Sequence, residues 1–168
     1  YRSAHNIVVA RGQSDPDLLH NLILAIIASG AYLSMREVEQ LTEYRGKAFL
    51  TKEPFLVERF AALAALARTY IGDVVGSEEA LATVDWSSSN ASDILIRLTQ
   101  ELAEQNLQPK GLIDGFFQLI LETLSDDKAL LTTSLSYASF LYQHGRFVDA
   151  LNILGPLMDM YKNDPKIL

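Results

Sequence analysis

The stretch LIDGFFQLILETL, residues 112–124, shows most clearly how this chain of 168 residues folds. Its apolar residues recur at intervals of three and four, which places them on one face of an α-helix. The same spacing runs through most of the sequence. Strand-like alternation of apolar and polar residues is not sustained, and residues 7–10 are the one run where a short strand would fit. The sequence therefore predicts an all-α fold.

Residues that favour helix ends divide the chain into separate helices. Asp15 precedes Pro16, an arrangement in which the carboxylate caps a helix and the proline takes its first position. Ser34 and Glu37 have the spacing of a capping box, and Ser77 precedes two glutamates, which favours a helix start there. Glycines at 30, 72 and 145 follow helical runs, where helices commonly stop. The predicted helices lie near residues 16–30, 34–47, 55–71, 77–86, 91–106, 109–124, 127–143 and 147–162.

Two of these segments favour a stack of antiparallel helical hairpins over a four-helix bundle. Helix 16–30 is apolar nearly all round, which predicts burial on most of its faces. Helix 55–71 has small side chains on more than one face, so that neighbouring helices can approach it from two sides. We expect residues 1–168 to form a single domain, with 87–90 as a loop inside it. The small residues of helix 55–71 are Ala61, Ala62, Ala64, Ala65 and Ala67.

Near the C-terminus, small and apolar residues recur in a pattern that resembles a tetratricopeptide repeat. They are Ala138, Leu141, Gly145, Phe147, Ala150, Leu151 and Leu154. The resemblance implies a right-handed stack of antiparallel hairpins, a degenerate solenoid of about eight helices. It also implies that Ala138 and Ala150 lie where two helices cross, and that Phe147 and Leu154 fill the space under the turn at Gly145. Pro156 departs from the pattern and predicts a kink or a split in the last helix.

A narrower resemblance covers residues 137–160, where the turn Gly145-Arg146 is followed by Ala150-Leu151. This segment is similar to segments of the small acidic chaperones of bacterial type III secretion, which are tetratricopeptide-like and of comparable length. The similarity implies that the chain would hold a secreted protein or a protein of the export apparatus.

Composition and charge exclude several classes of function. The chain has no cysteine, which excludes disulfides, zinc–thiolate sites and thiol nucleophiles. Residues 73–168 carry six basic and fourteen acidic side chains, a balance that disfavours nucleic acid as a partner. The unbroken apolar runs at residues 22–28 and 60–67 are both far shorter than the ~20 residues of a membrane span. We therefore expect no membrane insertion and a cytoplasmic location, and the opening Tyr1 suggests a piece of a longer chain.

Motifs that mark catalytic and metal sites are missing from the sequence. It contains no glycine-rich phosphate loop, no H-E-x-x-H and no G-x-S-x-G. We expect His20, inside a strongly apolar helix, to be a hydrogen-bonded structural residue rather than a metal ligand. His144 lies at a helix C-terminus, where its charge would be favourable. The sequence therefore predicts that the protein is not an enzyme and holds no cofactor or metal.

The resemblance to tetratricopeptide repeats implies a surface that receives a segment of another protein. The positions of this chain that match the family's groove are Thr132, Leu135, Ser139 and Tyr142. They include no basic or amide side chain to clamp a terminal carboxylate, so an apolar groove for an amphipathic segment fits them better. The acidic half of the chain would also suit a basic segment.

Three functions stay open at this point. The first is an adaptor or scaffold that binds a partner segment through a helical-repeat groove. The second is a secretion chaperone that holds a partner's apolar segment. The third is an architectural role, as part of a larger solenoid or as a homo-oligomerising piece.

Overall fold

The computed structural model describes residues 2–3, 15–86, 94, 97, 111–124 and 127–162. Within these ranges the regular structure is helical and contains no strand, which confirms the predicted all-α class. Residues 7–10, the one run where a short strand would fit, and the predicted loop at 87–90 lie outside the described residues. So does the helix predicted at 91–106, apart from Ile94 and Arg97, which are both helical. The helices are α2 (Pro16–Ala28), α3 (Met35–Leu50), α4 (Pro54–Ile71), α5 (Val74–Leu81), α7 (Leu112–Thr123), α8 (Asp127–Gln143) and α9 (Phe147–Tyr161).

Most of the helices begin and end where local signals place them. The Asp15 carboxylate accepts the backbone N–H of Leu18 at 2.9 Å, and Pro16 is the first residue of α2. The three glycines that follow helical runs, at 30, 72 and 145, have φ of 66°, 82° and 72°. This left-handed conformation is easy for glycine and reverses the chain direction, so each glycine ends its helix as predicted.

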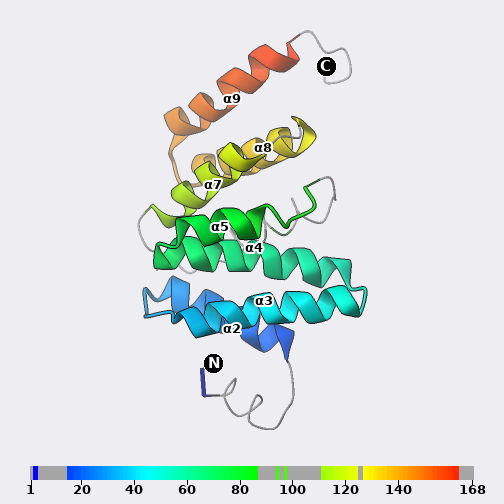
Figure 1. Ribbon diagram of the computed structural model, residues 1–168. Coiled ribbons are helices and arrows are strands. Elements are labelled where there is room, and N and C mark those ends of the chain that lie inside the picture. The colour runs from blue at the N-terminus through cyan, green and yellow to red at the C-terminus, as the bar shows by residue number, and fades with distance from the viewer. Residues whose placement is uncertain are drawn as a thin grey trace.

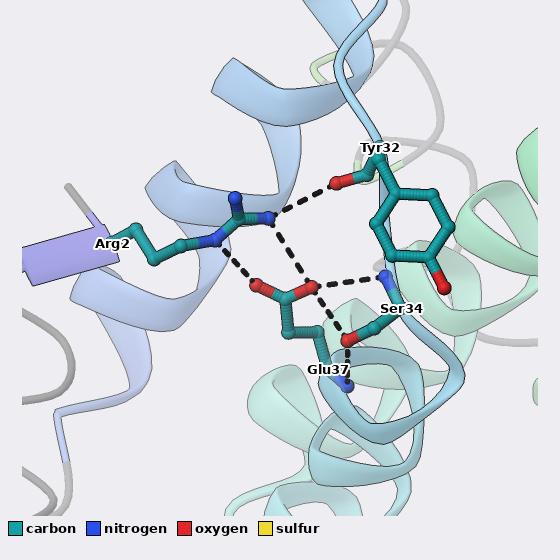
Figure 2. A network of polar contacts seen from close by, with 4 residues as sticks. All are labelled: Arg2, Tyr32, Ser34 and Glu37. Atoms are coloured by element: carbon teal, nitrogen blue, oxygen red, sulfur yellow. Dashed lines mark hydrogen bonds and ion pairs between the residues drawn. The ribbon is translucent and has the colours of Figure 1, made fainter.

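The start of α3 combines a capping box with an arginine from the beginning of the chain, Arg2 (Figure 2). The Glu37 N–H donates to Ser34 Oγ at 3.3 Å, and the Ser34 N–H donates to Glu37 Oε2 at 3.0 Å, which confirms the predicted box. Arg2 adds bonds from its guanidinium to Glu37 Oε1 at 2.9 Å and to the Tyr32 carbonyl at 3.0 Å. Burial alone would raise the pKa of Glu37, but the bonds from Ser34 and Arg2 outweigh it and lower that pKa.

The start of α5 was wrongly placed at Ser77. The helix runs from Val74 to Leu81. It begins at Val74 because the Asp73 carboxylate caps it by accepting the Gly76 N–H at 3.0 Å. Asp73 directly follows the left-handed Gly72, so the chain re-enters a helix at once. Ser77 is fully buried instead, and its hydroxyl donates to the Ala65 carbonyl of α4 at 2.8 Å. The pattern of a serine before two glutamates, which is typical of a helix start, therefore belongs here to a serine that links two helices.

Helix α4 lies at the centre of the described structure. It packs against α3 and α5, and also contacts α2 and α7. The chain turns from α3 to α4 at one edge and from α4 to α5 at the opposite edge, so these neighbours run antiparallel (Figure 1). All five predicted small residues of α4 are buried, as is nearly every apolar side chain of α2. Both packing predictions are therefore confirmed at the level of burial.

Pro156 does not split the last helix, because α9 runs from Phe147 to Tyr161 as one element. Proline cannot donate a hydrogen bond to the carbonyl four residues earlier, which belongs to Asn152. Asn152 and Pro156 are both exposed, so that carbonyl is near water. The missing bond therefore costs little, and the helix continues.

Candidate functional site

Helix α8 carries all four residues predicted to face a partner. Their spacing of three, four and three residues puts them on one face of the helix. Leu135, Ser139 and Tyr142 are exposed, whereas Thr132 is half-buried and its carbonyl accepts the Ser136 hydroxyl at 2.8 Å. The Ser139 hydroxyl accepts the Gln143 amide at 3.4 Å. The exposed part of this face is therefore apolar at Leu135 and Tyr142, with a short polar residue between them.

The exposed apolar face continues across the turn into α9. The ring of Tyr142 meets the ring of Phe147 edge-on, with centroids 5.1 Å apart and an interplanar angle of 66°. Phe147 was expected beneath the turn, but 54% of its surface is exposed, so that expectation is wrong. Leu141 and Ala150 are the buried residues of this hairpin, and Leu154 is half-buried against the core. Phe147 lies on the outside of the hairpin, against Tyr142.

Further exposed apolar residues follow Phe147 along α9. Leu151 and Met158 are four and eleven residues after it, which places all three in one stripe along the helix. Val148 lies beside the stripe. We call the set of these side chains and the two from α8 the α8–α9 apolar surface, and each member exposes half or more of its surface. Its members are Leu135, Tyr142, Phe147, Val148, Leu151 and Met158.

A polar network fixes the turn that carries this surface. Arg146, just before α9, donates to both oxygens of Asp114 in α7 at 2.8 and 2.7 Å and to Asp149 at 2.7 Å. The Tyr137 hydroxyl of α8 donates to the same Asp114 at 2.8 Å. Burial, followed by the bond to Asp114, raises the pKa of Tyr137 far above its usual range. One carboxylate therefore ties three helices together beneath the α8–α9 turn.

Sequence reasoning missed the α9 part of the apolar surface. Phe147 was assigned to the space under the turn because the repeat pattern places it there. The signal that could have found the surface is the stripe itself, since Phe147, Leu151, Leu154 and Met158 share one side of α9. Ala150 and Leu157 already supply the buried side of the helix. Because α9 has a second apolar side besides its buried one, a second packing contact is predicted for that helix.

The two histidines in the described ranges, His20 and His144, both make polar contacts within the fold. His20 is buried, and its Nδ1 accepts the Nε–H of Arg59 at 3.1 Å, while Arg59 also pairs with Asp17 at 2.6 Å. His144 is exposed near the end of α8, with its Nδ1 2.8 Å from the Phe140 carbonyl. Among the described residues, no three histidine, aspartate or glutamate side chains gather in a way that could hold a metal ion.

Glu58 is a buried carboxylate inside α4, with 7% of its surface exposed. Its Oε2 accepts the Asp85 N–H at 2.9 Å. Burial raises the pKa of Glu58 above its usual 4.5, and the charge of Asp85 acts in the same direction. The bond from the Asp85 N–H and the charge of Arg45 oppose that rise without cancelling it. The group therefore resists ionisation in the folded state.

This shift predicts how stability depends on pH. The pKa of Glu58 is raised on folding. Its contribution to the free energy of unfolding is therefore complete at pH values below the usual glutamate pKa, and is lost as the pH rises through the pKa of the folded state. Glu58→Gln keeps an acceptor for the Asp85 N–H and removes the charge. We expect its stability relative to the parent chain, measured by urea unfolding between pH 4 and 8, to increase as the pH rises.

Glu37→Gln provides a control of opposite sign. The pKa of Glu37 is lowered on folding, so its contribution is present above the usual value and is lost as the pH falls. This variant should be less stable than the parent at neutral pH, and the difference should shrink in acid. If both differences changed in the same direction with pH, the environment assigned to Glu58 would be wrong.

None of the helices in the described ranges combines the length and the apolar character that crossing a membrane requires. Comparison of the chain with protein-family models, with curated proteins and with solved structures finds no match to any of them.

Proposed function

We propose that this chain is a protein-binding adaptor or scaffold that holds an amphipathic segment of a partner protein on the α8–α9 apolar surface. The observation that carries the proposal is the run of exposed apolar side chains from Leu135 and Tyr142 across the turn to Phe147, Leu151 and Met158. Contiguous exposed apolar surface is unfavourable in water and is typical of interaction sites.

The chemistry of the surface supports an amphipathic helical partner. Tyr142 and Phe147 form an exposed aromatic pair, and large aromatic side chains supply much of the affinity at protein interfaces. The stripe on α9 spans twelve residues, from Phe147 to Met158, a length that suits a partner helix with apolar residues at intervals of three and four. Exposed Asp159 lies next to Met158, and residues 73–168 carry a net charge of −8. Basic residues at the rim of the partner segment would complement this charge.

The proposed architecture is the right-handed, tetratricopeptide-like stack of hairpins that the sequence resembles. It is supported by antiparallel neighbours, by left-handed glycines at the turns, and by buried Ala138 and Ala150 in the α8–α9 hairpin. In such a stack each hairpin covers the apolar side of the previous one. The exposed stripe on α9 is then a side that no described helix covers.

The same stripe favours one second candidate, an architectural role in which another copy of this chain covers α9. A symmetric dimer would bury the stripe of each copy against the other. Sedimentation equilibrium separates the two functions, because a stable homodimer that shields Leu151 and Met158 supports the architectural role. A monomer that binds a partner segment supports the adaptor.

The test of the adaptor function uses the double variant Leu135→Glu with Tyr142→Ala. A partner would first be captured from cells with a photo-crosslinking residue at position 151, and the crosslinked segment identified by mass spectrometry. Affinity for that segment as a synthetic peptide would then be measured by calorimetry. We expect the double variant to weaken binding at least tenfold, which is about 1.4 kcal/mol or more, and to keep its helical circular dichroism.

The matched control is Val75→Glu with Tyr32→Ala. It makes the same kinds of change at exposed apolar residues of α5 and of the turn before α3. This control should bind the peptide like the parent chain. Equal losses in both double variants, or parental affinity in the α8 variant, would remove the α8–α9 apolar surface as the binding site.

A further inference from the structure

All the sulfur atoms of this chain belong to methionines. The chain has no cysteine, and its three methionines are Met35, Met158 and Met160. Met35 is the first residue of α3, whereas Met158 belongs to the α8–α9 apolar surface. Met158 exposes 69% of its surface and Met35 exposes 43%. Of these two thioethers, a dissolved oxidant therefore has easier access to the one on the proposed binding surface.

Met158 lies at the C-terminal end of the stripe on α9. It follows Leu151 by seven residues, which is about two turns of the helix, and Leu154 by four. Leu157, the residue before it, supplies the buried side of the helix there. The methionine side chain is unbranched, apolar and adaptable, which suits contact with the apolar side chains of a partner. A change of polarity at Met158 therefore alters the proposed binding surface and not the buried side of α9.

Peroxide changes the polarity of a methionine by adding one oxygen atom to its sulfur. A lone pair of the thioether attacks one oxygen of hydrogen peroxide, the O–O bond breaks, and water leaves as the sulfur–oxygen bond forms. The sulfur is oxidised and the peroxide is reduced, so the reaction is balanced by these two reactants. Methionine sulfoxide, the product, is polar.

The exposure of Met158 separates the effect of this reaction on binding from its effect on folding. In the free chain, water solvates the sulfoxide oxygen, so the folded state loses little. When a partner's apolar side chains cover the position, the same oxygen loses its water and gains no hydrogen-bond donor, which costs free energy. Oxidation of Met158 therefore weakens the complex and leaves the fold intact.

We propose that Met158 is an oxidative modification site, at which peroxide releases a partner segment from the α8–α9 apolar surface. This inference rests on the proposed function and adds a means of regulating it. The reaction is reversible, because a methionine sulfoxide reductase uses two thiols to return the sulfoxide to the thioether, with a disulfide and water as the other products. The reduced chain binds the segment, the sulfoxide form binds it weakly, and reduction restores the binding.

The test uses a variant in which Met158 is the only methionine, Met35→Leu with Met160→Leu. The probe is a synthetic amphipathic peptide of leucine and lysine, with its leucines at intervals of three and four to match the stripe on α9. Calorimetry measures the affinity before and after mild treatment with hydrogen peroxide, and mass spectrometry checks the gain of one oxygen atom. We expect oxidation to weaken binding about tenfold, because the burial of one apolar side chain is lost.

Two further measurements distinguish a modification site from oxidative damage. Incubation of the oxidised variant with methionine sulfoxide reductase and dithiothreitol should restore the original affinity. The melting temperature, followed by circular dichroism, should be the same before and after oxidation. A fall in melting temperature that accompanied the loss of binding would overturn the proposal, because it would show that Met158 supports the fold.

Substitutions at position 158 provide the matched controls. Met158→Leu keeps an apolar side chain that peroxide does not oxidise, so it should bind the peptide equally well before and after treatment. Met158→Gln introduces a permanent polar group and should bind like the oxidised chain. In the parent chain, an excess of peptide should slow the oxidation of Met158 and leave that of Met35 unchanged, because α4, α5, α7 and α8 separate α3 from α9 (Figure 1).

The outcomes separate this inference from the function on which it rests. If the reduced chain does not bind the peptide, the proposed binding surface is wrong and the inference fails with it. If the reduced chain binds and the Met158 sulfoxide binds equally well, the surface stands and the modification site is wrong. A loss of affinity in peroxide-treated Met158→Leu would have the same meaning, because the oxidation that matters would then lie elsewhere.

Discussion

Phe117→Ala is expected to lower the free energy of unfolding by about 3–5 kcal/mol, the usual range when a buried phenylalanine is truncated. Phe117 lies in α7 and exposes 0% of its surface. Its ring stacks on that of Tyr137 with centroids 4.6 Å apart, and lies 6.4 Å from that of Phe140. Truncation leaves a cavity between α7 and α8 and removes the support of Tyr137, whose hydroxyl bonds Asp114.

Urea unfolding followed by circular dichroism measures this loss. Gln118→Ala is the matched control, because Gln118 is the next residue of α7 and is exposed. The control should change the free energy of unfolding by no more than about 0.5 kcal/mol. A loss below about 1 kcal/mol in Phe117→Ala would show that the α7–α8 contact is not part of the folded core.

Ala150→Trp is expected to disrupt the α8–α9 hairpin. Ala150 is buried in α9, and α8 is the helix that α9 packs against. An indole cannot fit in the space of a methyl group at this contact, and overpacking of a core typically costs about 1–3 kcal/mol and occasionally more. Because α9 depends mainly on this contact, the loss should be local. It should appear as faster amide hydrogen exchange in α8 and α9, with α3 and α4 unchanged.

The control for this substitution is the next residue in the chain. Leu151→Trp places the same indole on the exposed stripe, where 65% of the leucine surface is open. Hydrogen exchange in this variant should match that of the parent chain. If the two tryptophan variants behaved alike, Ala150 would not lie between the two helices.

The helix boundaries could be predicted where the cause is local. The caps at Asp15 and at Ser34 with Glu37, and the left-handed Gly72, depend on residues within four positions of each other, and the structure confirms them. The predicted start of α5 at Ser77 was wrong because the Ser77 side chain does not cap its own helix. Its hydroxyl bonds a carbonyl of α4 twelve residues earlier, and no spacing rule reveals such a contact.

The candidate surface could be predicted on α8 and not on α9. The face of α8 follows from helical spacing, so Leu135 and Tyr142 are exposed together as a single helix requires. The exposure of Phe147 depends on how α8 and α9 pack together, and in that packing Leu141 and Ala150 are the buried residues. The positive φ of Lys52, 57°, was also hidden, because lysine does not signal positive φ in a sequence.

The amino-acid sequence by itself determined the all-α class, most of the helix limits and which face of each helix is apolar. These depend on interactions between residues within one or two turns of a helix, whose geometry is the same in every protein. Only the tertiary structure decided which apolar faces are covered and which stay in water. That outcome depends on the volume left when several helices pack together, which no single helix specifies.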